Sequence, residues 1–170
     1  MKKIEQKITP FLWFNTEAEA AVNYYVSMFS EKFGDTKINS ITRYDEAGAN
    51  ASGQKVGSVM TIDFQLAGQN FVAINGGPFY SFSGAVSFVI NCETQDEVDY
   101  FWEKLSEGGE AGVCGWINRD RFNLTWQVVP IILTKLLQDQ DSVKSQNVMK
   151  AMLKMTKIEI KELQDAYDGK

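Results

Sequence analysis

The strongest constraint on the fold is an internal repeat of one element order. Residues 86–130 read as strand, capped helix, glycine stop and further strands, and residues 8–75 carry the same order. Capping boxes at Thr16–Glu19 and Thr94–Glu97 mark the two helix starts, and their threonines lie 78 positions apart. A chain that repeats such a unit usually builds a cup between two half-sheets.

Side-chain periodicity predicts the elements inside each repeat. Apolar residues recur at helical spacing in 18–29 and 98–105, and they alternate with polar ones in 56–66. Gly34 and Gly108 are expected to end the two helices, since glycine enters the left-handed region without a Cβ penalty. The polar stretch Asp45–Lys55 is expected to be a flexible loop. The remaining predicted strands are 8–14, 37–43, 71–74, 86–90, 115–118 and 124–129.

The residues after Pro130 predict helices. One helix is expected over 131–137, a second is expected to be capped by Ser142, and a third begins at the capping box Thr156–Glu159. The sequence therefore predicts an α+β protein with a first module over residues 1–75, a second over 85–130 and a helical tail over 131–170, all in a single compact domain.

Charge and composition exclude several classes of protein. The net charge of −5 argues against a general nucleic-acid surface, which needs clustered lysine and arginine. No apolar run approaches the length of a membrane span, so we expect no membrane insertion and a cytoplasmic protein. Cys92 and Cys114 are expected to be free thiols, because disulfides are rare in that compartment.

Several segments together resemble the vicinal oxygen chelate superfamily, also called the glyoxalase/bleomycin resistance fold. The segments are ITPFLWFNTEAEAAVNYYVSMF, INGGP, SFVINCETQDEVDYFWEKLSEGGE, CGWINRDRFNLTWQVVP and VMKAMLKMTKIEIKELQDAY. Within the superfamily, the chain is similar to the PhnB-like branch that carries the description 3-demethylubiquinone-9 3-methyltransferase. The resemblance implies two βαβββ modules, a half-open eight-stranded cup and a homodimer.

The resemblance also implies where a metal would lie, and the residues there argue against one. Superfamily enzymes hold a divalent metal with His, Glu or similar ligands on the first and last strands of each module. The chain has no histidine, and the equivalent strands, 8–14, 70–75, 85–91 and 125–130, carry no Asp or Glu. Gln127 falls near the last-strand ligand position, but amides bind transition metals poorly. We therefore predict no metal and no other cofactor.

Catalytic motifs are weak in this sequence. The first strand ends at Asn15 without the glycine-rich turn that a nucleotide cofactor would require. Gly76–Gly77 also follows a strand, but Pro78 after it is incompatible with such a turn. Cys114, activated by Arg119 or Arg121, is the one suggestive thiol, although a packed residue before a tight turn explains it more simply.

A small-molecule pocket fits the sequence better. Aromatic side chains together with a few polar groups describe an ordinary ligand site, although core packing or dimer contact would explain any one aromatic. The candidate pocket residues are Trp13, Phe64, Asn75, Phe79, Tyr80, Ser87, Trp116, Arg121, Trp126 and Gln127.

Three functions stay open at this point. The first is a metal-free, dimeric binding protein for an unidentified apolar or aromatic small molecule. The second is an enzyme, possibly the methyltransferase that the branch is named after, with Asp63 or Asp120 as the titratable group. The third is a structural or interaction role, in which side chains fill the cup.

Overall fold

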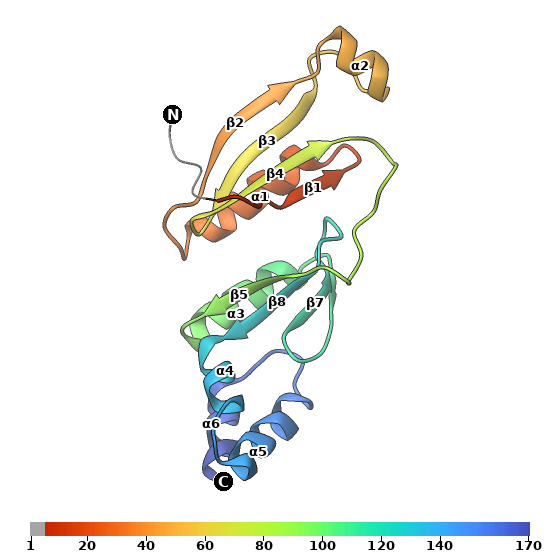
Figure 1. Ribbon diagram of the computed structural model, residues 1–170. Coiled ribbons are helices and arrows are strands. Elements are labelled where there is room, and N and C mark those ends of the chain that lie inside the picture. The colour runs from red at the N-terminus through yellow and green to blue at the C-terminus, as the bar shows by residue number, and fades with distance from the viewer. Residues whose placement is uncertain (1–5) are drawn as a thin grey trace. The chain divides into compact units, whose positions relative to one another are not determined.

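The computed structural model describes residues 6–170, and these form two compact units that divide between Ser81 and Phe82. The first unit runs β1 (Phe11–Phe14), α1 (Ala18–Ser30), β2 (Lys37–Arg43), α2 (Glu46–Ser52), β3 (Val59–Leu66) and β4 (Gln69–Asn75). Its four strands form one sheet in the order β1-β4-β3-β2 (Figure 1). The β1–β4 pair is parallel, and the other neighbours are antiparallel.

The second unit repeats this topology and then adds the tail. It runs β5 (Phe88–Cys92), α3 (Gln95–Ser106), β6 (Glu110–Ala111), β7 (Trp116–Arg119) and β8 (Trp126–Pro130), followed by α4 (Ile131–Leu137), α5 (Ser142–Met152) and α6 (Ile160–Asp168). The sheet order is β5-β8-β7-β6, again with a parallel pair of first and last strands. The predicted α+β fold of two βαβββ modules with C-terminal helices is therefore confirmed.

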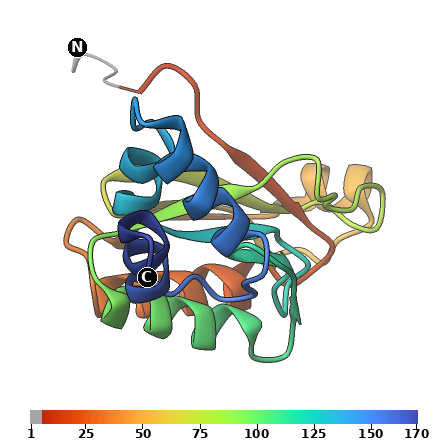
Figure 2. The same ribbon diagram turned by 90° about the horizontal axis from the view of Figure 1, so that it is seen from below.

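In each unit one helix covers one face of the sheet. The apolar stripe predicted for α1 is buried, as are the side chains that alternate toward it from the first sheet. In the second unit α3 lies along one side of the cyan strands (Figure 2) and buries its own stripe against β5, β7 and β8. The buried side chains of these two cores include Ala18, Ala21, Val22, Tyr25, Phe29, Leu12, Phe14, Ile62, Phe64, Leu66 and Ala73 in the first, and Val98, Phe101, Leu105, Ile90, Ile117, Trp126 and Val128 in the second.

The start of α1 is capped by a residue distant in sequence. The predicted capping box Thr16–Glu19 does not form, because the helix has no local side-chain cap. Instead, Asn75 at the end of β4 accepts a hydrogen bond from the Ala18 backbone N–H through Oδ1 (2.8 Å). The Asn75 Nδ2 donates to the Val59 carbonyl (3.1 Å), and the residue is only 7% exposed. Asn75 thus ties α1 to β3 and β4.

The end of α1 also differs from the prediction. The helix ends at Ser30, before Gly34, and the left-handed residue in this turn is Asp35, with φ 49°. Aspartate tolerates this region because its short polar side chain can bond locally. The Gly34 prediction was therefore wrong.

The stretch Asp45–Lys55, expected to be a loop, contains the two-turn helix α2. The Asp45 Oδ1 accepts from the Gly48 backbone N–H (2.7 Å) and caps the helix, and Gly53, with φ 71°, ends it in a left-handed conformation. The local caps therefore offset the poor helix propensity of its small residues.

The predicted start of α3 is largely confirmed. The Thr94 side chain accepts from the Glu97 backbone N–H (3.2 Å). The Glu97 carboxylate reaches back to the backbone N–H of Glu93 (2.6 Å), one residue earlier than a standard capping box would place it. Gly108 follows the helix with φ 72°, as predicted.

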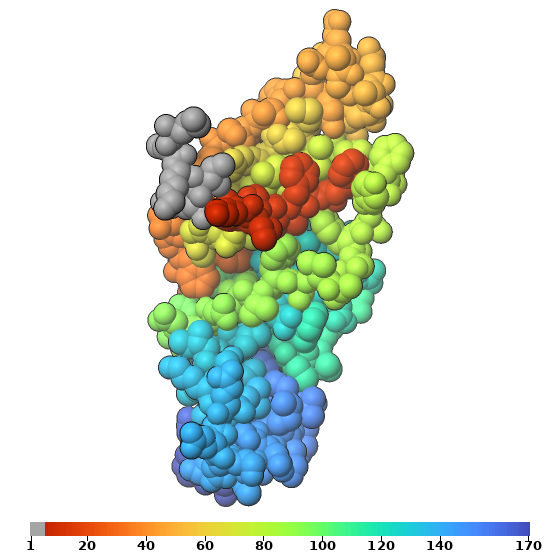
Figure 3. All heavy atoms as spheres, in the orientation of Figure 1, coloured from red at the N-terminus to blue at the C-terminus, as the bar shows by residue number. Residues whose placement is uncertain are grey.

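The tail has its own apolar core and is joined to the second sheet by backbone hydrogen bonds. Its helices pack as one block, blue in Figure 3. Cys114 N donates to Met155 O (2.8 Å) and Gly115 N to Thr156 O (2.7 Å), so the segment before α6 lies beside the start of β7. The buried members of the tail core are Leu133, Leu136, Val148, Met155, Ile158 and Leu163.

Two predicted caps in the tail lie at other residues. Helix α5 is capped by Asp141 rather than Ser142, since its carboxylate accepts from Val143 N (3.0 Å) and Lys144 N (3.3 Å). Helix α6 begins at Ile160, so the predicted capping box Thr156–Glu159 precedes it without capping it.

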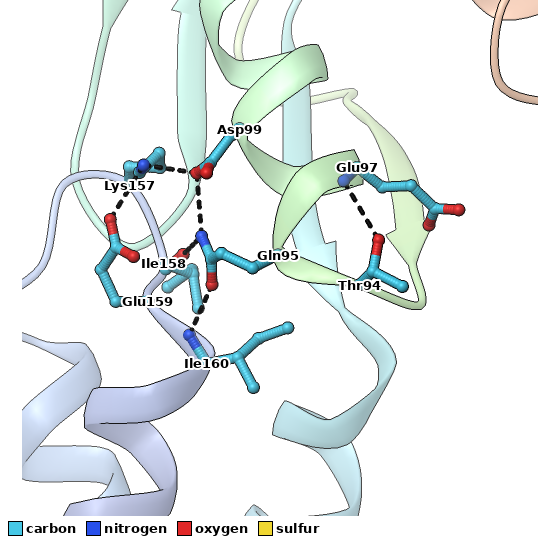
Figure 4. A network of polar contacts seen from close by, with 8 residues as sticks. All are labelled: Thr94, Gln95, Glu97, Asp99, Lys157, Ile158, Glu159 and Ile160. Carbon is cyan, nitrogen blue, oxygen red and sulfur yellow. Dashed lines mark hydrogen bonds and ion pairs between the residues drawn. The ribbon is translucent and has the colours of Figure 1, made fainter.

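A polar network fastens the tail to α3 (Figure 4). The Gln95 Oε1 accepts from the Ile160 N–H (2.8 Å) and so caps α6 from another helix. The Gln95 Nε2 donates to Ile158 O (3.1 Å) and to the Asp99 carboxylate (2.9 Å). Lys157 donates to the same carboxylate and pairs with a second acid, Glu159, at 2.9 Å.

We predict that Asn75→Ala destabilises the protein by about 2 kcal/mol, because it removes two buried hydrogen bonds and leaves their partners unsatisfied. Asn91, the exposed asparagine of β5, is the matched control, and Asn91→Ala should change the free energy of unfolding by less than about 0.5 kcal/mol. Urea unfolding followed by circular dichroism measures both. Equal effects of the two substitutions would contradict the role assigned to Asn75.

We predict that Lys157→Met destabilises the protein most between about pH 5 and pH 9. The hydrogen bond from Lys157 lowers the pKa of Asp99 below 3.8, so this stabilisation is present above that value and is lost as the pH falls through the lower folded pKa. The hydrogen bonds to Asp99 and Glu159 raise the pKa of Lys157 above 10.5, so its contribution is present below that value and is lost as the pH rises through the higher folded pKa.

Because both side chains of this pair are partly exposed, the effect of Lys157→Met should stay below about 1 kcal/mol at neutral pH. Lys154→Met is the control, since Lys154 forms no ion pair with residues 6–170. Thermal unfolding of both variants from pH 2.5 to pH 11 tests the prediction. A difference from wild type that does not shrink toward either extreme would count against it.

Candidate functional site

Each sheet has one face that its own helix does not cover, called the open face below. On the first sheet, the register places Trp13, Ile74 and Thr61 side by side, because Trp13 pairs with Ile74 and Ile74 with Thr61. The neighbouring row, with Leu12 and Ala73, points to α1 and is buried. The alternation of strand side chains therefore puts Trp13 on the open face.

The indole of Trp13 is fixed by the loop that follows β4. Its Nε1–H donates to the Gly77 carbonyl (2.9 Å), and its ring meets Tyr80 edge-on with centroids 5.0 Å apart. A Cβ on Gly76 would lie 2.1 Å from the Trp13 ring atom Cζ2, so only glycine allows this approach. The structure thus brings together two predicted site residues, Trp13 and Tyr80.

The open face of the second sheet carries three more predicted residues. Gln127 of β8 lies opposite Trp116 in β7 and Val89 in β5. The Gln127 Nε2 donates to the hydroxyl of Ser87, just before β5, at 2.8 Å. A tryptophan and two neutral polar groups therefore share this face, each of them partly buried.

Three predicted site residues point to the helix-covered faces instead. Phe64 is fully buried and stacks on Phe71 at 5.4 Å, within the core beneath α1. Trp126 is 2% exposed and lies beside Ile117 in the core of the second unit. Asn75 caps α1. Phe64 and Trp126 are therefore core residues, and Asn75 is a helix cap.

Two further candidates lie on loops and make structural or solvent contacts. Arg121 donates to the carboxylate of Glu107 (2.7 Å) and to its backbone carbonyl (3.2 Å), so it holds the end of α3. Phe79 lies next to Tyr80 and is 70% exposed.

The two carboxylates named for an enzymatic role differ in their surroundings. Asp120 is 3% exposed and accepts hydrogen bonds from Phe122 N (2.8 Å), Leu124 N (3.0 Å) and Trp126 Nε1 (2.9 Å). It therefore organises the β7–β8 turn. Asp63 lies on β3 and accepts from Asn39 Nδ2 (3.0 Å).

Neither thiol has the environment of a nucleophile. Burial raises the pKa of Cys92 to about 12, so this thiol is protonated at neutral pH. Cys114, with φ 55°, donates weakly to the Met152 carbonyl at 3.5 Å. Arg119, one of the two arginines named above as its activator, pairs with Glu110 (2.5 Å). Both cysteines are free, as predicted.

The side chains on the first and last strands do not fit a divalent transition metal. Strands β1, β4, β5 and β8 carry no His, Asp or Glu, and their one thiol, Cys92, is fully buried among the core residues. Within residues 6–170, no three His, Cys, Asp or Glu side chains gather as a metal site would require. Neutral amides and hydroxyls are poor ligands for such ions.

A separate open groove of about 670 Å³ lies within the second unit, between the start of α3 and α6. It contains none of the predicted site residues. Most of its lining side chains are charged or polar, and several already pair with one another, as Lys161 does with Asp165. The lining residues are Glu93, Thr94, Gln95, Glu159, Ile160, Lys161, Gln164, Asp165, Asp168 and Lys170.

In residues 6–170, no helix combines the length and the apolar character that crossing a bilayer demands.

Gly76 is the site residue that sequence reasoning missed. The sequence signal was available, since a glycine directly after a strand often marks a close approach of another group. The sequence could not show which side chain approaches Gly76, because Trp13 lies on another strand, 64 residues before the neighbouring Gly77.

We predict that Gly76→Ala displaces the Trp13 indole and destabilises the protein by about 1–3 kcal/mol, since the new methyl group has no space. Gly84→Ala is the control, because a Cβ at Gly84 meets no atom within 4 Å. Urea unfolding and the tryptophan emission spectrum measure both variants. A Gly76→Ala protein as stable as the control, with an unshifted spectrum, would show that the indole is not held in this way.

Comparisons with known proteins agree with this architecture. A family model described as 3-demethylubiquinone-9 3-methyltransferase matches residues 6–129. A PhnB protein from Bacillus cereus, which carries the same description, is 34% identical over 74% of this chain and 99% of its own, with a TM-score of 0.63. Both comparisons thus leave about a quarter of the chain unmatched. A search of curated proteins gave no match.

More distant structures share the fold alone. A Pseudomonas aeruginosa protein is 18% identical over 74% of this chain and 98% of its own, with a TM-score of 0.55. The fosfomycin resistance protein FosX from Listeria monocytogenes is 14% identical over 81% of this chain and 100% of its own, with a TM-score of 0.52. The chain therefore belongs to the 3-demethylubiquinone-9 3-methyltransferase family.

Proposed function

We propose that this protein binds an apolar or aromatic small molecule on the open faces of its sheets and does so without a metal. The observation that carries the proposal is the pair of tryptophans, Trp13 and Trp116, each on the open face of one sheet. Ser87 and Gln127 add neutral hydrogen-bonding groups beside the second. Aromatic surface with a few polar groups is the usual composition of a small-molecule site.

The residues on these faces suit binding better than metal-assisted catalysis. At the places that hold metal ligands in superfamily enzymes, β1 and β8 present Trp13 and Gln127 here, and Ser87 directly precedes β5. None of these side chains is charged at neutral pH, so the affinity would come from apolar contact and neutral hydrogen bonds.

Methyl transfer is the second candidate, and the family description favours it. The common nucleotide site at a glycine-rich turn after the first strand has no counterpart here. The turn after β1 lacks the glycines, and the first N–H of α1 is already bound by Asn75. A methyltransferase of this fold would therefore need to hold its methyl donor elsewhere.

We further propose that the protein is a homodimer in the cytoplasm. Each sheet has two edge strands, β1 and β2 in the first and β5 and β6 in the second. Uncovered strand edges can pair with another chain, and a second copy is the partner that the superfamily resemblance implies.

Native mass spectrometry of protein purified without added metal or cofactor tests the proposal. We expect the mass of a dimer with an organic adduct, or a dimer that binds added aromatic compounds. An increment of metal size would overturn the metal-free part of the proposal. Uptake of added S-adenosylmethionine would instead favour methyl transfer. A protein that takes up none of these ligands would indicate a structural role.

A further inference from the structure

The pair formed by Ser87 and Gln127 has hydrogen-bonding capacity to spare. Among the interactions of residues 6–170, the 2.8 Å bond between Gln127 Nε2 and Ser87 Oγ is the only side-chain hydrogen bond that either residue makes. The Gln127 Oε1 therefore keeps its lone pairs, and the Ser87 hydroxyl keeps its proton to donate. The pair offers one acceptor and one donor next to each other.

The unpaired polar atoms of this face are not sealed inside the protein. In the described part of the chain, no buried side-chain nitrogen or oxygen lacks a partner, so the uncommitted Oε1 of Gln127 is not sealed inside the protein. The same holds for the indole Nε1 of Trp116, which makes no hydrogen bond within residues 6–170. Exchanging the amide nitrogen and oxygen of Gln127 changes which residue donates, but the pair still presents one donor and one acceptor.

The row of side chains around the pair is neutral. Trp116 and Val89 flank Gln127 on the neighbouring strands of the same face. The nearest basic side chain of β7, Arg119, alternates away from Trp116 and is paired with Glu110. A charged ligand would find no opposite charge in this row, whereas a planar neutral ligand could lie against the indole.

We propose that Ser87 and Gln127 bind the edge of a neutral planar ligand that carries a hydrogen-bond acceptor beside a donor, as a lactam does, while Trp116 lies against its ring. The proposal rests on the proposed function and names the chemical class of its ligand. The donor of the ligand meets the free acceptor of the pair, and its acceptor meets the free donor. Blocking the ligand donor should therefore weaken binding.

Three probes separate this inference from simple apolar binding: 2-quinolone, its N-methyl derivative and naphthalene. Two-dimensional ¹H–¹⁵N NMR of the full chain follows the Gln127 side-chain amide and the Trp116 indole N–H during titration. We expect 2-quinolone to bind about fivefold or more tightly than the N-methyl compound, as the loss of one neutral hydrogen bond implies. It should also shift both signals.

Two variants and a control complete the test. Gln127→Met removes the free acceptor and should bring the affinity ratio of 2-quinolone to its N-methyl derivative close to one. Ser87→Ala removes the free donor and should weaken the binding of both compounds, because both carry the carbonyl acceptor. Both variants should still bind naphthalene. Asn91→Ala, on the same strand as Val89, should leave the ratio unchanged. Loss of the ratio in this control as well would overturn the assignment to Ser87 and Gln127.

The two proposals fail in different ways. If all three probes bind with similar affinity, the lactam inference is wrong and the aromatic-binding function stands. If none of the probes binds, the binding function fails and the inference fails with it.

Discussion

The architecture depends on one constraint, the parallel pairing of the first and last strands of each module. Parallel neighbours cannot be joined by a tight hairpin, so the chain must leave the sheet and return. In both units it does so through a helix, α1 or α3, that lies on one face, and the remaining strands follow antiparallel. One helix covers one face only. Every open-face feature of the two sheets, including Trp13 and Trp116, follows from this arrangement.

Local periodicity made most of the fold predictable, and distant contacts made the rest unpredictable. Strands and helices leave periods of 2 and 3.6 residues in any short window of sequence. The cap of α1 leaves no such trace, because Asn75 reaches Ala18 across 57 residues. Likewise, Gln95 reaches Ile160 across 65 residues, so the cap of α6 was placed at Thr156, three residues before Glu159. Helix α2 was missed because its small residues are typical of a loop, although Asp45 before them is a good helix cap.

The candidate site was predicted only in part. The sequence showed which residue types are present, but the face of the sheet on which each side chain lies was not predicted. Aromatic and amide side chains occur on both faces of a sheet, and composition cannot separate them. Alternation could have done so, since Phe64 shares its face with Ile62 and Leu66, and Trp126 with Val128. A tryptophan in phase with such aliphatic residues belongs to the core, whereas Trp13 and Trp116 are out of phase with their aliphatic neighbours. What the sequence alone lacked was the side on which each helix packs.

On an open face of this kind, a catalytic site needs a titratable group beside the ligand, whereas a binding site does not. General acid–base catalysis requires a group that gains and loses a proton within hydrogen-bonding distance of the reacting atom. The row formed by Val89, Gln127 and Trp116 contains no such group. The first sheet contains Asp63 in β3, which already accepts a hydrogen bond from Asn39. The second sheet can therefore recognise a ligand by shape and neutral hydrogen bonds, and any proton transfer in this protein would have to draw on a residue outside that row.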